Sequence, residues 1–242
     1  MGAAAANAYV IDFENVDTTN APFAALIADG DYVTQGGFFV QGQDIHNDSD
    51  PYAPSGFLVG SLVNGADSGT CLDGVCPAGN ATNYYATVND SVVHFGLMSG
   101  GNSSLSSFDA AFLAPSGVTL ASGTVAYLAI DAERSDGSYA VGIFPLGGLT
   151  ADGSTAFTTL QASSAQIIEG TGTLSSGRVT DMFAYAYYCS DAGCSAFDSN
   201  KGQFALDNIA INVSAVPEPS QGLLLLSGLG AVGAIARRRR AR

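Results

Sequence analysis

The sequence predicts an all-β protein, an antiparallel β-sandwich of the jelly-roll type. Short runs rich in β-branched and aromatic residues recur along the chain. Turn-forming pairs such as Asn64-Gly65 and Asp152-Gly153 separate these runs. No segment before residue 214 shows a helical period of 3.6 over twelve residues. We expect strands at residues 9–16, 32–40, 57–63, 92–98, 108–113, 124–131, 138–144, 156–161, 179–188 and 203–213.

Each expected strand is bounded by residues that favour turns. The turn Asp29-Gly30-Asp31 precedes the run 32–40, and Asn64-Gly65 follows the run 57–63. Asp136-Gly137 divides the runs 124–131 and 138–144, which predicts a hairpin. In the run 179–188 the aromatic residues alternate, and residues 195–202 read as a loop before the last strand.

Charge is distributed unevenly along the 242 residues. Residues 1–215 hold three basic and 21 acidic residues, a formal charge of −18. Such a surface repels nucleic acid, because nucleic-acid binding needs clustered Lys and Arg. Acidic surfaces suit solubility and divalent cations. Five of the eight basic residues lie at the very end, from Arg237 to Arg242.

The two ends carry sorting signals of different strength. Ala6-Asn7-Ala8 fits the small-x-small site of a signal peptidase, although the usual cationic and apolar regions before it are missing. We expect residues 1–8 to be a signal-peptide remnant; the alternative is a meaningless Ala-rich start. The C-terminus combines Pro217-Glu218-Pro219, an apolar run at 222–236 and an arginine cluster. As a helix the run is roughly 22 Å long, short of the ~30 Å hydrocarbon layer unless flanking residues help.

These three tail elements resemble the PEP-CTERM sorting signal of Gram-negative bacteria. The resemblance implies that an exosortase processes the tail at Val216, Pro217, Glu218 and Pro219. It also implies an envelope or extracellular-matrix location near exopolysaccharide and biofilm. By the positive-inside rule, the cluster of Arg237, Arg238, Arg239 and Arg240 would stay in the cytoplasm and leave the body outside. An ordinary tail anchor is the alternative, but it leaves the Pro-Glu-Pro element unexplained.

The four cysteines form two matched C-x4-C pairs, Cys71 with Cys76 and Cys189 with Cys194. A turn inside each pair can bring the Cα atoms to the roughly 5.5 Å that a disulfide needs. A four-thiolate zinc site is the alternative, but no Lys or Arg flanks either pair to offset thiolate charge. Since export implies an oxidising compartment, we expect two local disulfides.

A second resemblance concerns the body. Residues 203–209, Gln-Phe-Ala-Leu-Asp-Asn-Ile, have the QFxxD form of one PEP-CTERM family. Residues 11–14, Ile-Asp-Phe-Glu, and the segment from Arg134 to Ser138 resemble parts of carbohydrate-binding-module jelly rolls. These short motifs support the fold more than a function.

In such jelly rolls the first and last strands often lie side by side, so acids at their ends can share a calcium ion. Glu14 and Asp207 form the best candidate pair, with Asp12 next. Asp12 and Glu14 are two residues apart in an expected strand, which puts them on one face. The alternative is that hydrogen bonds from a neighbouring loop satisfy Asp207. Calcium is the only cofactor that the sequence suggests.

Other candidate residues give weaker signals. Neither His46 nor His94 belongs to a catalytic motif, and His94, inside an expected strand, reads as structural. Acids such as Asp44, Asp48 and Asp50 do not form a complete EF-hand calcium loop. We therefore expect them to lie in solvated loops. Phe183, Tyr185 and Tyr187 share one strand face, which we expect to be core rather than a sugar platform.

We therefore expect a signal-peptide remnant at 1–8, a sandwich at 9–213, a linker at 214–221, a transmembrane helix at 222–236 and a cytoplasmic tail at 237–242. The expected function is that of a non-catalytic envelope protein, bound to glycan or calcium or serving structurally. Its expected partners are an exosortase, the inner membrane and exopolysaccharide, but not nucleic acid. The alternatives are a secreted polysaccharide-active enzyme and a self-assembling surface subunit.

Overall fold

The computed structural model describes residues 7–45, 56–71, 75–114, 118–120, 122–197 and 200–213, and there the protein is all-β. All pairings between named strands are antiparallel within these ranges, as predicted. The strands are β1 (Asn7–Ile11), β2 (Leu26–Ala28), β3 (Tyr32–Gln35), β4 (Phe38–Gln43), β5 (Leu58–Asn64), β6 (Asn83–Thr87), β7 (Val92–Leu97), β8 (Ser103–Phe112), β9 (Thr124–Arg134), β10 (Tyr139–Gly147), β11 (Thr158–Gln161), β12 (Gln166–Gly170), β13 (Val179–Ser190), β14 (Gly193–Ser195) and β15 (Phe204–Val213). In the part of the chain that the structure describes, short 3-10 helices occur at Ser68–Thr70 and Ala162–Ser164.

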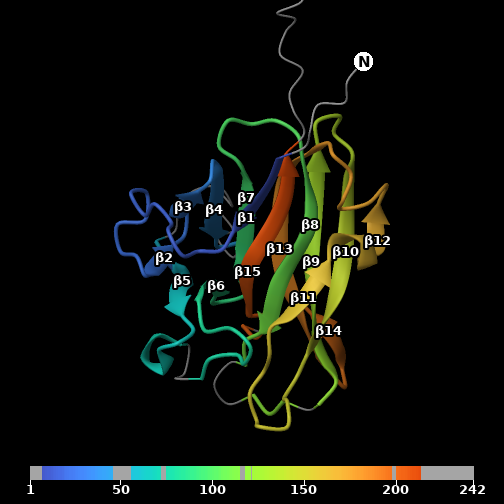
Figure 1. Cartoon of the computed structure of the whole chain (residues 1–242). Helices are drawn as coiled ribbons and strands as arrows, with labels where there is room; N and C mark the ends of the chain where they lie inside the picture. Colours follow the sequence, from blue (N-terminus) through green and yellow to red (C-terminus); the bar gives the residue numbers. More distant parts are fainter. Residues whose placement is uncertain are drawn as a thin grey trace, which may run out of the picture.

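The strands form two layers (Figure 1). One layer runs in the order β12-β10-β9-β13-β7-β4-β3, with β14 attached to the end of β13. The other runs β11-β8-β15-β6-β5-β2, with β1 also paired to β15. A single ladder pair, Val179 with Ser103, joins the layers at one corner. In Figure 1, β8, β11 and β15 lie nearer the viewer than β9, β10 and β13.

The hydrophobic core fills the space between the layers. Phe108 of β8 meets Phe144 of β10 edge to face, with ring centroids 5.0 Å apart. Phe13 packs near Tyr85 of β6, and both are at most 2% exposed. In the middle of β13 the core residues are Met182, Ala184 and Ala186. These alternate positions point inward, and therefore the residues between them point outward.

Two strand predictions are wrong in detail. The run 32–40 is a hairpin of two strands, because Gly36 and Gly37 adopt positive φ and turn the chain between β3 and β4. The run 9–16 ends as a strand at Ile11, because Phe13 takes a φ of 56° and turns its ring into the core. Asp12 and Glu14 consequently follow the strand rather than share one of its faces.

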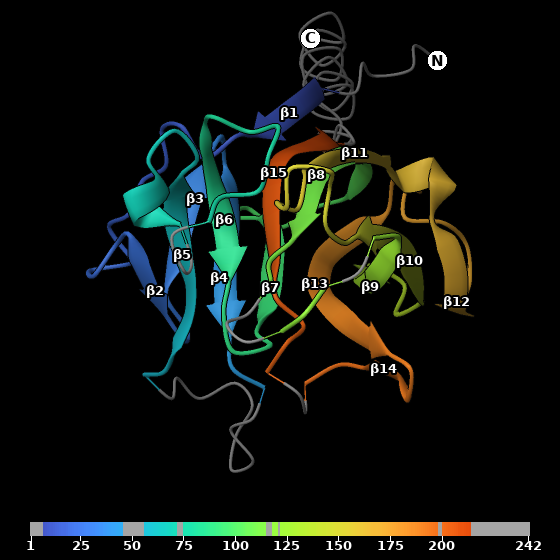
Figure 2. The same ribbon diagram turned by 90° about the horizontal axis from the view of Figure 1, so that it is seen from below.

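The pairing of β1 with β15 confirms that the first and last strands are neighbours. Asn7 is opposite Val213. In Figure 1, β1 begins and β15 ends at the upper end of the sandwich. Figure 2 looks from the other end, where the hairpin of β13 and β14 projects. Within the described ranges no helix is long and apolar enough to cross a membrane. The expected transmembrane helix at 222–236 lies outside those ranges.

Candidate functional site

The outward side of β13 carries the aromatic stripe that the sequence analysis assigned to the core. Phe183, Tyr185 and Tyr187 are half-buried on the outside, while Met182, Ala184 and Ala186 are at most 2% exposed inside. The prediction was wrong because alternation defines two faces without saying which one meets the opposite layer. We call this side of the layer, across β4, β7, β13, β9, β10 and β12, the outer face.

Ladder register continues the stripe across neighbouring strands. Phe183 is opposite both His94 of β7 and Asp131 of β9, and His94 is opposite Gln41 of β4. The His94 ring stacks on Phe183 at 4.3 Å and meets Phe39 edge-on at 4.7 Å. The ring is also fixed by Asp181, whose Oδ1 lies 3.0 Å from Nε2. His94 is therefore an ordered part of the outer face, and its role as a structural residue stays a prediction.

A second group of rings lies further along β13. Tyr185 packs at 5.5 Å from Tyr187 and at 5.0 Å from Phe197. Tyr187 is opposite Tyr127 of β9 in the ladder. Burial first, and then the hydrogen bond with Tyr187, raise the pKa of Tyr185, so its hydroxyl remains protonated. The outer face thus presents a row of partly exposed rings with polar tips.

Carboxylates lie beside these rings: Asp131, Glu133, Glu169 and Asp181. Tyr139 donates to Glu169 over 2.6 Å, and a cavity of about 330 Å³ lies between Asp131, Glu133, Tyr139 and the β9–β10 turn. Asp131 Oδ1 is buried without a hydrogen-bond partner among the described residues. Burial first, then Glu133 and Glu169, raise the pKa of Asp131. The outer face is therefore both aromatic and acidic.

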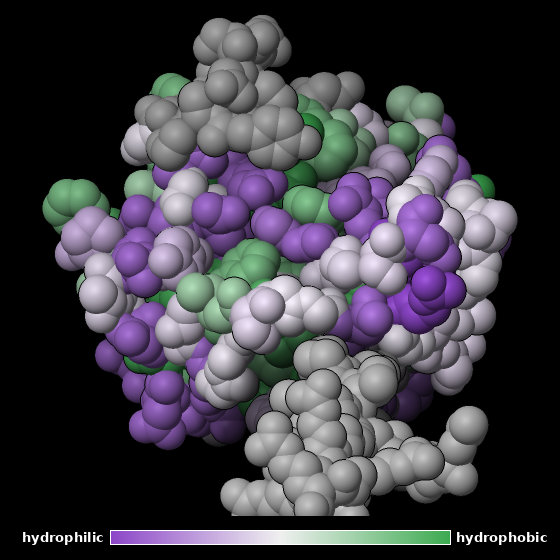
Figure 3. All heavy atoms as spheres, turned by 90° about the horizontal axis from the view of Figure 1, so that it is seen from above, coloured by the Kyte–Doolittle hydropathy of each residue, from purple (hydrophilic) through white to green (hydrophobic). Residues whose placement is uncertain are grey.

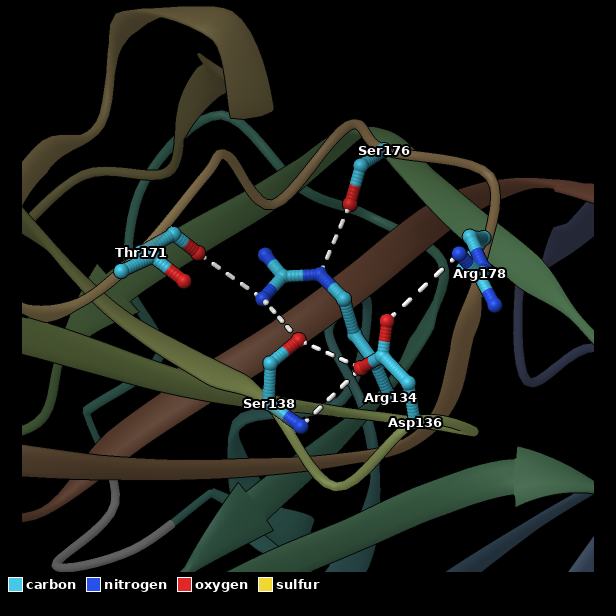
Figure 4. A network of polar contacts seen from close by, with 6 residues as sticks. All are labelled: Arg134, Asp136, Ser138, Thr171, Ser176 and Arg178. Atoms are coloured by element: carbon cyan, nitrogen blue, oxygen red, sulfur yellow. Dashed lines mark hydrogen bonds and ion pairs between the residues drawn. The ribbon is translucent and has the colours of Figure 1, made fainter.

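Arg134 anchors the loops at the upper edge of this face (Figure 4). Its side chain is 8% exposed and donates to Ser176 Oγ at 2.9 Å, Thr171 O at 2.8 Å and Thr173 O at 3.0 Å. Asp136 accepts hydrogen bonds from the backbone and hydroxyl of Ser138, which lower its pKa. Arg178 pairs with Asp136 at 3.5 Å. The network ties the β9–β10 turn to the segment before β13.

The predicted calcium residues lie near one another but are held by hydrogen bonds. Asp207 is fully buried and accepts from Asn80 Nδ2 at 2.7 Å, Thr82 Oγ1 at 3.3 Å and the Asn208 backbone at 2.7 Å. Glu14 accepts from the Asn83 backbone at 2.7 Å. Both carboxylates therefore accept hydrogen bonds from residues 80–83, where the chain enters β6.

Asp12 is engaged elsewhere: its Oδ1 accepts from the side chain of Gln35 and from the backbone of Glu14. The described residues contain no group of three or more His, Cys, Asp or Glu side chains that could hold a metal ion. Calcium needs six to eight oxygen ligands, and donors already occupy the oxygens of Asp207. The residues present therefore do not fit a calcium ion as they stand, and the calcium site stays a prediction.

Both predicted disulfides are present, which rules out the alternative of a four-cysteine zinc site. Cys71 is bonded to Cys76, and Cys189 to Cys194 across the β13–β14 hairpin. The hairpin disulfide lies at the far end of the strand that carries the aromatic stripe. His46, Asp48 and Asp50 lie outside the described residues.

Comparison with known protein families finds a match in the C-terminal tail. The model of the PEP-CTERM protein-sorting motif matches residues 215–240, which include Pro217, Glu218, Pro219 and the arginines 237–240. The chain carries a PEP-CTERM protein-sorting motif. This motif implies an exported protein that an exosortase processes, and the disulfides agree with a location outside the cytoplasm. No curated protein matches the chain.

Two solved structures show distant similarity to the chain. The CBM22-1 xylan-binding domain of Xyn10C from Paenibacillus barcinonensis is 12% identical, with a TM-score of 0.36, and the match covers 89% of this chain and 99% of that domain. An agarase is also 12% identical, with a TM-score of 0.30, over 74% of this chain and 25% of the agarase. At these scores neither similarity assigns a ligand or an activity to this chain.

Proposed function

We propose that this exported protein is a non-catalytic glycan-binding protein whose site is the outer face. The observation that carries the proposal is the row of rings that β13 turns toward solvent, flanked by hydrogen-bonding side chains of β4, β7 and β9. Rings of this kind offer flat apolar area to the C–H faces of sugars. Gln41, His94 and Asp181 stand beside them and can bind hydroxyl groups.

The charges of the outer face narrow the class of glycan. Asp131, Glu133, Glu169 and Asp181 repel uronic-acid polymers. Of the two arginines at the edge of this face, Arg134 is buried among carbonyl and hydroxyl groups and Arg178 is paired with Asp136. Neutral polysaccharides fit better than acidic ones.

The proposal includes the tail. The run 222–236 anchors the chain in the inner membrane until an exosortase cleaves near Val216–Pro219, and the body then stays near exopolysaccharide in the envelope or matrix of a Gram-negative host. Arg237 to Arg240 keep the end of the anchor in the cytoplasm. Support comes from the matched sorting motif and from the lengths and charges of its parts.

Binding can be tested by affinity electrophoresis of the full chain through gels that contain neutral or acidic polysaccharides. Tyr185→Ala should weaken binding to the best neutral polymer about tenfold, because a lost aromatic contact corresponds to about 1.4 kcal/mol. Tyr9→Ala removes an exposed tyrosine outside the outer face and should not change binding. Asp181→Asn should also weaken binding, while it leaves the aromatic packing in place.

If no polysaccharide retards the wild-type chain, or if both tyrosine variants bind equally well, the outer face is not a glycan site. Release of reducing sugar by the wild type would instead favour a polysaccharide-active enzyme.

A further inference from the structure

The upper end of the sandwich is a flat row of strand ends. Ladder pairs run from Asn7 to Val213, from Val213 to Ser103, from Ser103 to Val179 and from Val179 to Arg134. Turns at 36–37, 98–102, 135–138 and 171–178 complete this end, which we call the anchor pole. The backbone N–H of Met98 donates to the carbonyl of Gly37, and that of Ser135 donates to the carbonyl of Arg178. The four turns are thus linked in two pairs.

The anchor pole differs in charge from the rest of the acidic body. Its four turns contain one acid, Asp136, and that carboxylate is paired with Arg178. The turns at the opposite end carry Asp44, Asp90, Asp152 and Asp191. A negatively charged surface would therefore repel the turns of the anchor pole less than it repels the turns at the opposite end.

The surface of the anchor pole also includes an apolar side chain, because Met98 is 52% exposed in the 98–102 turn. Most other residues of these turns are Gly, Ser, Thr or Asn. Figure 3, which looks onto this end, shows hydrophobic and weakly polar residues among hydrophilic ones.

The chain leaves the sandwich at this same end. β15 ends at Val213, the sorting motif begins at residue 215 and the apolar run begins at residue 222. Even fully extended, residues 214–221 span at most about 29 Å. The ten residues of β15 alone span about 33 Å, so the opposite end of the sandwich cannot reach the membrane surface.

We propose that, while the tail is intact, the anchor pole rests on the anionic lipid headgroups of the membrane. Arg178 faces the headgroup phosphates, and Met98 enters the interfacial layer. The sandwich then stands upright, with the outer face turned sideways into the surrounding matrix. This inference depends on the proposed membrane anchor but not on glycan binding.

The absence of tryptophan from the chain allows a direct test. Met98→Trp places a single fluorophore at the anchor pole. Leu149→Trp, at an exposed position after β10, places one at the opposite end. Each full-length variant is reconstituted into phosphatidylethanolamine–phosphatidylglycerol vesicles whose acyl chains carry bromine, a contact quencher of tryptophan. Equal melting temperatures of the variants and the wild type would show that the fold is retained.

Met98→Trp should lose fluorescence in brominated vesicles relative to unbrominated ones, while Leu149→Trp should not. Adding Arg178→Glu to Met98→Trp should reverse part of that loss. If the chain floats with the vesicles but both fluorophores are unquenched or equally quenched, the proposed orientation is wrong although the anchor stands. A chain that does not float with the vesicles overturns the anchor and, with it, this inference.

Discussion

Asp207 makes the stability of this protein depend on pH in an unusual direction. The carboxyl is fully buried, and burial raises its pKa from 3.8 to about 6. Below pH 4 the group is protonated in both the folded and the unfolded chain and contributes nothing to pH dependence. Between pH 4 and 6 only the folded chain holds the proton, so the free energy of unfolding falls as pH rises. A shift of about 2 pKa units corresponds to about 3 kcal/mol, lost in full by pH 7.

Asp207→Asn tests this linkage, because the amide resembles the protonated carboxyl in shape and charge. Denaturant unfolding of the full chain in detergent with EDTA, at pH 4 and pH 7, gives the free energy of unfolding for both proteins. Relative to Asp207→Asn, the wild type should lose about 2 kcal/mol between these pH values, because at pH 4 the carboxyl of the unfolded chain is already about half ionised. Asp191→Asn removes the same charge at an exposed position. The difference in unfolding free energy between this variant and the wild type should therefore be nearly the same at both pH values. A difference between wild type and Asp207→Asn that is the same at both pH values would refute the reasoning.

Three further predictions concern metal binding, oxidation and packing. If calcium binds at Glu14 and Asp207, the melting temperature of the wild type, measured by calorimetry, should be higher in Ca²⁺ than in EDTA, and that of Asp207→Ala should not. An equal melting temperature of the wild type in Ca²⁺ and in EDTA would contradict this prediction. Replacing Cys189 and Cys194 by serine should lower the free energy of unfolding by about 2 kcal/mol, and mass spectrometry after alkylation without reductant should find no label on the wild type. Gly60→Ala would place a methyl group against the buried ring of Tyr85 and should cost about 1–3 kcal/mol in denaturant unfolding, whereas an unchanged midpoint would contradict the packing.

The sequence predicted features that depend on local chemistry. The C-x4-C spacing predicted both disulfides once the export signal implied an oxidising compartment, and the order of the tail elements was enough to identify the sorting motif. The neighbouring positions of β1 and β15 were also predicted correctly, from a resemblance to jelly rolls.

Features that depend on the opposing layer were missed. On β13 the larger side chains suggested the core, yet Ala184 and Ala186 face inward, where Phe108 and Phe144 from other strands take part in the core. The short strands β2, β6, β12 and β14 were not predicted. Nor did the spacing of residues reveal that Arg134 would be buried among the backbone carbonyls of residues 171 and 173.

The most direct test of the central claim is hydroxyl-radical footprinting of the intact chain, with and without the polysaccharide that binds it best. Oxidation of each tyrosine, read by mass spectrometry, reports which rings the glycan covers. We predict that glycan protects Tyr127, Tyr185 and Tyr187 of the outer face and leaves Tyr9 unchanged. Protection confined to rings away from β9 and β13 would contradict the assignment of the outer face as the glycan site.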